Sequence, residues 1–169
     1  MRIISRLDIK MGTLIKSVMY DGVRKIGNPV EYANDYVESS VDELMLINNT
    51  GSLYNTKLDL NLIKDIRKKK ALPISAGGGI TNYEDAENLI QSGCDKVVIN
   101  SLIHKNVEEV VKIVDALGSS SVTGAIQFEK KDDIYVTLYE MARESTGLNL
   151  IDTIKMYKDL GIGELLITD

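Results

Sequence analysis

The chain has 169 residues, 44% of them hydrophobic and 27% charged, and 20 Lys and Arg against 25 Asp and Glu give a formal net charge of −5. This length is enough for roughly one folded domain, which excludes disorder as the main state, and the acidic balance argues against a dedicated nucleic-acid binder. The single cysteine, Cys94, excludes a disulfide scaffold, and no apolar run reaches the roughly 18 residues that a membrane span needs. Charged residues interrupt the apolar run at the N-terminus, which argues against a signal peptide. We therefore expect a cytoplasmic protein with no nucleic-acid or membrane partner.

The chain alternates short β-branched runs with segments of helical period, which is typical of a βαβ series. The expected strands, in order, are Ile3–Ile9, Glu43–Asn48, Leu72–Ala76, Lys96–Asn100, Ser121–Gln127 and Glu164–Asp169. The expected helices between them are Pro29–Ser39, Asp59–Lys70, Tyr83–Ser92, Asn106–Leu117 and Leu150–Leu160. Because the strands are mostly continuous apolar runs, we expect a parallel sheet that is covered on both faces.

Two further segments interrupt this alternation. Gly12–Tyr20 and Asp133–Glu140 each come soon after an expected strand and are rich in β-branched and aromatic residues. We expect them to form extended excursions after the first and fifth strands. In α/β folds the carboxyl ends of the strands carry the chemistry, so both excursions lie near the expected site.

A weak internal repeat has a period of about 120 residues. VDELMLIN at Val41–Asn48 is similar to IGELLITD at Ile162–Asp169, and RLDIK at Arg6–Lys10 aligns with AIQFE at Ala125–Glu129. The two offsets, 121 and 119 residues, agree closely enough to predict duplicated four-strand halves. Eight strands in that arrangement form a (β/α)₈ barrel, which typically takes about 250 residues.

The length therefore predicts an incomplete fold. We expect an α/β chain of the parallel (β/α)₈ TIM-barrel type with about six strands, strands seven and eight being missing. It would form one partial domain over residues 1–169, with a first half-barrel over about 1–120 and the start of a second half over about 121–169. Because the sequence ends directly after a strand, at Asp169, we interpret it as a piece of a longer protein.

Three glycines, Gly77, Gly78 and Gly79, follow the third strand and precede a helix. Consecutive backbone N–H groups in such a turn can bind an anion, and the helix N-terminus adds free donors. The alternative is a tight strand-to-helix turn without a ligand, which the glycines alone make equally reasonable. Asn100 and Ser101 end the next strand, also before a helix. Because two adjacent strand ends would converge there, we favour a phosphate site.

Asp8 ends the first strand, and Lys16 lies in the segment that follows it. A carboxylate near cations at the mouth of a barrel can stay ionised and act as a base. The alternative is a solvated pair of loop charges. Cys94 and His104 make no nucleophilic or metal-ligating constellation, so we expect neither a metal nor a cofactor.

Four charged residues share a different position, at or just before the start of a strand. They are Arg2, Glu43, Lys96 and Glu164. In a barrel they would meet at the amino-terminal end of the strands as a neutral ring of ion pairs. That end usually serves stability, so the residues alone favour a structural ring over a functional gate.

Several motifs, in this order, resemble the cyclase subunit of imidazole glycerol phosphate synthase, a lyase of histidine biosynthesis, over essentially the whole chain. They are RLDIKMGTLIKS, NPVEYANDY, VDELMLI, AGGGI, GCDKVVINS, ESTGLNLIDTIK and GIGELLITD. The resemblance implies a duplicated (β/α)₈ barrel. It also implies a glutamine amidotransferase partner, docked at the barrel bottom, that supplies ammonia for cleaving and cyclising a phosphoribulosyl-formimino-aminoimidazole carboxamide ribonucleotide.

The resemblance assigns roles to residues of this chain. Asp8 matches the first catalytic aspartate and Lys16 an active-site lysine, while Gly77–Gly79, Asn100 and Ser101 match one substrate phosphate site. Thr146 and Gly147 match a loop contact near the substrate. The ring of Arg2, Glu43, Lys96 and Glu164 matches the charged gate at the ammonia entrance, which turns the interpretation of that ring towards function.

The chain also departs from the family pattern. Gln127 stands where the second catalytic aspartate is expected, and glutamine cannot exchange a proton near neutral pH, so two-carboxylate catalysis is lost. Asn48 replaces an aspartate after the second strand and Glu129 a lysine after the fifth. The second phosphate site belongs to the strands that we expect to be missing. We therefore expect that this chain cannot complete the reaction unaided.

These departures leave alternatives open. RLDIK and the non-aspartate at Gln127 resemble paralogues associated with surface-polysaccharide genes, which are thought to transfer nitrogen onto sugars. A phosphate-binding module without catalysis is a further alternative. Six strands would leave open sheet edges, so we also expect self-association, most simply as a dimer.

Overall fold

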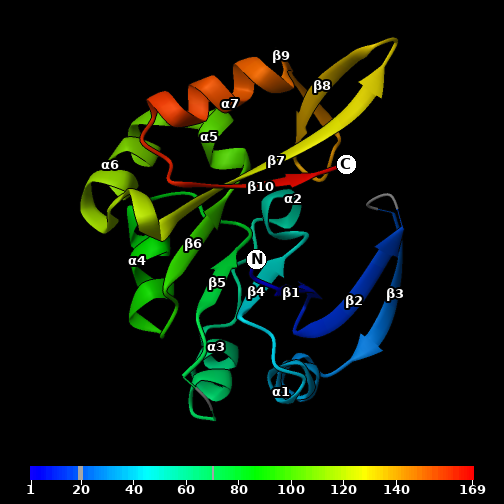
Figure 1. The fold of residues 1–169 in the computed structure, drawn as a ribbon, viewed down its shortest axis with the longest axis vertical. Coiled ribbons are helices and arrows are strands. Elements are labelled where there is room, and N and C mark those ends of the chain that lie inside the picture. Colours follow the sequence, from blue (N-terminus) through cyan, green and yellow to red (C-terminus); the bar gives the residue numbers. More distant parts are fainter. Residues whose placement is uncertain (19–20, 70) are drawn as a thin grey trace.

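The computed structural model describes residues 1–18, 21–69 and 71–169. Met19 and Tyr20, at the end of the predicted excursion, and Lys70, at the end of a predicted helix, lie outside the described residues. Figure 1 shows the central strands with helices packed along their outer side.

The described residues form ten strands in one sheet. The strands are β1 (Ile4–Lys10), β2 (Thr13–Val18), β3 (Asp21–Gly27), β4 (Glu43–Asn48), β5 (Ile74–Gly77), β6 (Lys96–Ile99), β7 (Val122–Lys131), β8 (Ile134–Tyr139), β9 (Glu144–Asn149) and β10 (Glu164–Thr168). Nine follow the order β3-β2-β1-β4-β5-β6-β7-β8-β9, and β10 pairs with β7. The strands β1, β4, β5, β6, β7 and β10 run parallel to their neighbours in this series, as in a TIM-barrel-like fold.

The expectation of an incomplete parallel barrel of about six strands, with strands seven and eight missing, is wrong. The sheet contains ten strands, including an uninterrupted run through β7, β8 and β9. The physical reason is that the two predicted excursions do not stay outside the sheet. Each pairs antiparallel with the strand before it and with one more strand after it, as β1-β2-β3 and β7-β8-β9. Figure 1 shows both hairpins on the right of the view.

The helices that the sequence predicted are confirmed to within a few residues. They are α1 (Pro29–Glu38), α3 (Leu60–Arg67), α4 (Tyr83–Gln91), α6 (Val107–Leu117) and α7 (Leu150–Asp159). Their starts are fixed by capping side chains: Asn28 accepts from Val30 N, and Asn82 accepts from Asp85 N. Two short helices, α2 (Gly51–Tyr54) and α5 (Ser101–Lys105), and a 3₁₀ turn at Ser119–Ser121 were not predicted.

The parallel strands bury both faces, as expected from their apolar runs. On β4, Leu44 and Leu46 pack outward into the main core under the helices, while Met45 and Ile47 point inward to a small cluster with Val98. This alternation gives the strands an inner face, and residues two apart on it lie one layer higher. The inner face carries both polar sites described below.

The same element order occurs twice along the chain, as β1-β2-β3-α1-β4 and as β7-β8-β9-α7-β10. This repeated element order agrees with the sequence repeat. The division of the chain near residue 120 into two related halves stays a prediction. No helix among the described residues is long and apolar enough to cross a membrane.

Candidate functional site

Four charged side chains meet at the amino-terminal ends of the parallel strands. Glu43 begins β4, Lys96 begins β6, Glu164 begins β10, and Arg2 lies just before β1. Lys96 Nζ lies 3.3 Å from Glu43 Oε2 and 2.8 Å from Glu164 Oε1. Arg2 lies 3.4 Å from Glu43 and 3.2 Å from Glu164. The structure thus brings together the four residues predicted as a ring, which we call the charged ring.

Hydroxyl groups support the charged ring from inside. Ser75 Oγ donates to Glu43, and Thr123 Oγ1 donates to Glu164 Oε2 over 3.4 Å. Glu43 is 1% exposed, so its charge needs these partners to be stable there. At Glu164 burial alone would raise the pKa, but the hydrogen bonds and charges of its cations, led by Lys96, outweigh burial and hold the pKa below its ordinary value.

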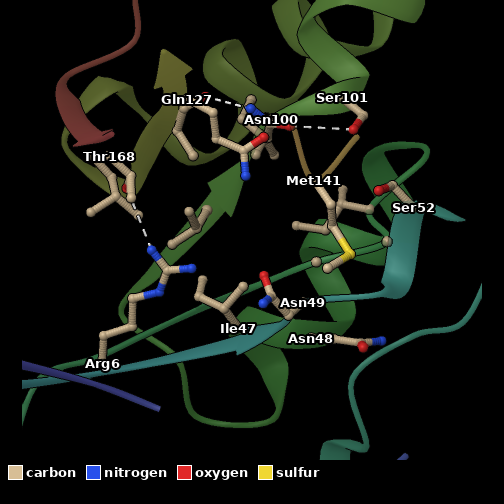
Figure 2. Close-up of a pocket in the computed structure, with 17 residues that line it drawn as sticks. Arg6, Ile47, Asn48, Asn49, Ser52, Asn100, Ser101, Gln127, Met141 and Thr168 are labelled. Atoms are coloured by element: carbon tan, nitrogen blue, oxygen red, sulfur yellow. Dashed lines mark hydrogen bonds between the residues drawn. The ribbon is translucent and has the colours of Figure 1, made fainter. Parts of the chain in front are cut away.

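A pocket opens at the opposite, carboxyl-terminal ends of the same strands (Figure 2). Of the residues predicted to bind or convert substrate, its lining contains Gly78, Gly79, Asn100, Ser101 and Gln127. Gly77 is the buried last residue of β5, directly before this lining. The structure therefore gathers the predicted phosphate residues and Gln127 at one place.

The glycine loop is held by close backbone packing. Gly78 and Gly79 have φ of +96° and +79°, and a Cβ on them would lie 2.1 Å from the carbonyl oxygens of Asn48 and Thr56 respectively. These contacts require glycine whether or not a ligand binds. The tight-turn interpretation is thus sufficient for the glycines, and their role in phosphate binding stays a prediction.

Asn100 and Ser101 use their side-chain donors within the protein. Asn100 Nδ2 donates to Ala125 O over 2.7 Å, and Ser101 Oγ donates to Asn100 Oδ1 over 3.3 Å. Tyr157 Oη donates to the same Ala125 oxygen over 3.2 Å and lies 3.1 Å from His104 Nε2. A ligand beside Asn100 and Ser101 would therefore contact mainly backbone N–H groups and the Ser101 side-chain oxygen.

Asp8 and Lys16 are not brought together. Asp8 Oδ1 accepts a hydrogen bond from Arg6 Nε over 2.8 Å. Arg6 lines the pocket, whereas Asp8 does not. Lys16 is exposed on β2 and is not among the described residues of the lining. The predicted base thus lies beside the pocket, joined to it through a guanidinium group.

Gln127 lines the pocket, and its Oε1 accepts from the backbone N–H of Ala142 over 2.9 Å. Thr146 and Gly147, predicted as a substrate loop, lie instead in strand β9. Thr146 Oγ1 lies 2.6 Å from Thr137 Oγ1 in a network between β8, β9 and α7, so its hydroxyl is engaged away from the pocket lining.

The lining also contains residues that the sequence analysis missed, namely Arg6, Asn49, Ser52, Met141 and Thr168. Strand alternation could have found Asn49, because it follows Met45 and Ile47 at intervals of two. Asn48, which stands where the resemblance expects an aspartate, also lines the pocket, while its Nδ2 donates to Thr56 O over 3.0 Å. Met141 had no local signal, since it reaches the pocket only because the β8–β9 hairpin folds back.

Of the two residues that the sequence analysis set aside, Cys94 is buried and His104 is half-buried. Burial raises the pKa of the Cys94 thiol to about 12, which keeps it protonated and unreactive. Burial lowers the pKa of His104, which packs against the rings of Tyr139 and Tyr157. Neither residue lines the pocket.

Comparison with known proteins shows what the chain is similar to. The model of the family described as "Histidine biosynthesis protein" matches residues 2–169. Imidazole glycerol phosphate synthase subunit HisF of Legionella pneumophila is 36% identical over 168 residues, which are 99% of this chain and 79% of the relative. The HisF subunits of Thermococcus onnurineus and Natranaerobius thermophilus are 33% and 35% identical over 99% of this chain. The chain spans 66% of the length of each of these two relatives.

Proposed function

Because the chain belongs to the histidine biosynthesis protein family, we propose that it acts as the cyclase subunit of an imidazole glycerol phosphate synthase. In that role it would use ammonia to cleave and cyclise a phosphoribulosyl-formimino-aminoimidazole carboxamide ribonucleotide. The products would be imidazole glycerol phosphate and an aminoimidazole carboxamide nucleotide. The observation that carries the proposal is the pair of polar sites at opposite ends of the same strands, the charged ring below and the pocket above.

In this proposal the charged ring is the ammonia entrance. Glu43 is 1% exposed and Lys96 13%, so their ion pair closes the inner part of the ring, while Arg2, at 58%, is its outermost member. Moving Arg2 would open the ring from outside without exposing the buried pair. A glutamine amidotransferase partner would therefore dock at this end, around Arg2.

The pocket would hold the phosphorylated substrate. Backbone N–H groups of the Gly78–Gly79 turn and of Ser101 would bind one phosphate. Asp8 would act as the base, and Arg6 would fix the position of its carboxylate through their 2.8 Å contact. Gln127 would orient the substrate by hydrogen bonds, since its amide cannot transfer a proton.

The test is turnover of the ribonucleotide by the purified chain, with an ammonium salt as nitrogen donor and chromatographic detection of both products. We expect ammonia-dependent product, reduced about 100-fold or more in Asp8→Asn. Asp115→Asn, the same change at an exposed position on α6, should leave the rate unchanged. Absence of both binding and turnover contradicts the proposal.

Gln127 and the Arg6-bound Asp8 favour a second candidate, a binding module without catalysis. Binding of the ribonucleotide without any product, with or without added amidotransferase, would support that candidate. The motif RLDIK at Arg6–Lys10 and the non-aspartate at Gln127 are also the features that resemble the surface-polysaccharide paralogues. Ammonia-dependent amination of a sugar nucleotide in place of the ribonucleotide would support that alternative.

We also propose self-association in a cytoplasmic setting. In the described residues β10 pairs only with β7, so one of its edges is unpaired. Ile3, Ile4, Leu165 and Ile167 are 57%, 39%, 38% and 45% exposed on or beside β1 and β10. Pairing of two such edges would cover these side chains. Light scattering at micromolar concentration should give the mass of a dimer, and a monomer mass contradicts this.

A further inference from the structure

The inner face of β4 places a polar side chain where the strand reaches the pocket. Met45, Ile47 and Asn49 occupy successive inward positions, and the first two belong to the inner apolar cluster. The backbone N–H of Asn49 donates to Ile9 O over 3.0 Å, which fixes this residue beside β1. Figure 2 shows its amide turned into the group of pocket side chains, whereas Asn48 lies at the edge.

The amide of Asn49 has a donor without a protein partner. Asn49 is 7% exposed, and its Nδ2 has no hydrogen-bond partner among the described residues. A buried amide donor that stays unpaired costs about 1–3 kcal/mol. A donor placed in this way on the wall of a pocket indicates an acceptor supplied by a ligand.

Arg6 supplies further donors from the neighbouring strand. Its Nε donates to Asp8 and its Nη1 to Thr168 Oγ1 over 3.5 Å, and the side chain lines the same pocket. A guanidinium has five N–H groups, so donors remain after these two contacts. Its charge, however, is already balanced by Asp8. No carboxylate side chain lines the pocket among the described residues.

These facts define the group that fits. We propose that Asn49 and Arg6 together bind a neutral carbonyl oxygen, such as that of a carboxamide, in the part of the ligand that lies away from the phosphate at the Gly78–Gly79 turn. A second anion here would leave uncompensated negative charge beside Asp8 in a poorly solvated place, whereas a carbonyl satisfies the donors without adding charge. This inference rests on the proposed function, since it assumes that the Gly78–Gly79 end takes a phosphate.

The test compares two probes by calorimetric titration of the whole chain: aminoimidazole carboxamide ribonucleotide, and ribose phosphate, which lacks the carboxamide. We expect Asn49→Leu to weaken binding of the carboxamide probe about tenfold and to leave ribose phosphate binding unchanged. Asn61→Leu, the same change at an exposed position on α3, should affect neither. Should Asn49→Leu fail to fold, as judged by circular dichroism, Asn49→Ser serves as the second variant, with the same expected direction.

The outcomes separate the two proposals. Equal weakening of both probes, or no weakening of either, overturns the carbonyl assignment while the proposed function stands. If the unaltered chain binds neither probe, the proposed function fails and the carbonyl assignment fails with it. Selective loss of the carboxamide probe supports both.

Discussion

The two ends of the parallel strands treat their polar groups in opposite ways. At the strand starts, each member of the charged ring has an oppositely charged partner within 3.4 Å, and hydroxyl groups fill in behind the carboxylates. At the strand ends, the amides of Asn48 and Asn49 each keep one buried atom that has no hydrogen-bond partner within the described part of the chain, although the backbone around them is tightly packed.

One set of strands can thus serve two purposes. The four side chains of the charged ring are held together by their ion pairs, so the ring opens only if one of these side chains moves. The pocket combines a rigid backbone with unsatisfied side chains, which is what a preorganised binding site requires.

The largest effect is expected at Gly78, because its surroundings leave no space for a side chain. Gly78→Ala would place a Cβ 2.1 Å from Asn48 O at φ +96°, so β4 or the loop must shift. We expect a loss of about 4 kcal/mol in the free energy of unfolding, measured by urea denaturation. Gly118→Ala, at φ +83° and ψ +148° with nothing within 4 Å, should lose only about 2 kcal/mol, the cost of the backbone conformation alone. Equal losses would show that the pocket end is not rigid.

Opening the charged ring should cost somewhat less. Lys96→Met leaves Glu43, which is 1% exposed, with Arg2 as its remaining cation at 3.4 Å. We expect a loss of about 3 kcal/mol in the free energy of unfolding, because a buried carboxylate loses its better-buried partner. Lys155→Met, at an exposed pair with Asp152, should leave the denaturation midpoint nearly unchanged. If both variants behave alike, the ring is a surface feature and the contrast between the ends fails.

The elements that the sequence predicted well depend on local interactions. The start of α1 follows from Asn28 and Pro29, and the start of α6 from Asn106 and the apolar spacing after it. The strands β3 and β9, DGVRKIG and ESTGLN, were missed because they contain few apolar residues. Their pairing with β2 and β8 is what makes them strands, and that partnership is not written in their own sequences.

The two polar sites differ in the same way. The charged ring was predicted because each member stands at the start of an apolar run, a position readable from sequence. Asn49 was missed because adjacent residues of a strand point to opposite faces, and which of Asn48 and Asn49 follows Met45 and Ile47 inward depends on the register of β4 with its partners. Arg6 and Asp8 share one face, since they pair with Met45 and Ile47, so alternation could not single out Arg6 as the residue that lines the pocket.

The smallest expected effect is a dependence of stability on pH that separates the ends. His104 lies behind the pocket, and because Tyr157 uses its hydroxyl hydrogen on Ala125 O, the His104 ring donates to Tyr157 through Nε2. Burial lowers the pKa of His104 in the folded protein below its ordinary value of 6.5. Below that value the unfolded chain binds a proton that the folded chain resists, so the free energy of unfolding falls as the pH falls.

This loss is limited to about 1.4 kcal/mol per pH unit, and it ends where the folded protein also takes up the proton. The pKa of Glu164 is lowered instead, below its ordinary value of 4.5. The stability that the ionised Glu164 contributes is therefore fully present above pH 4.5 and is lost only in more acidic solution. Urea denaturation between about pH 7.5 and 5.5 therefore probes the pocket end and leaves Glu164 of the ring charged. His104→Gln should flatten the dependence over this range, while Lys96→Met should keep it. A slope that survives in His104→Gln would mean that another group, outside the His104–Tyr157 contact, controls it.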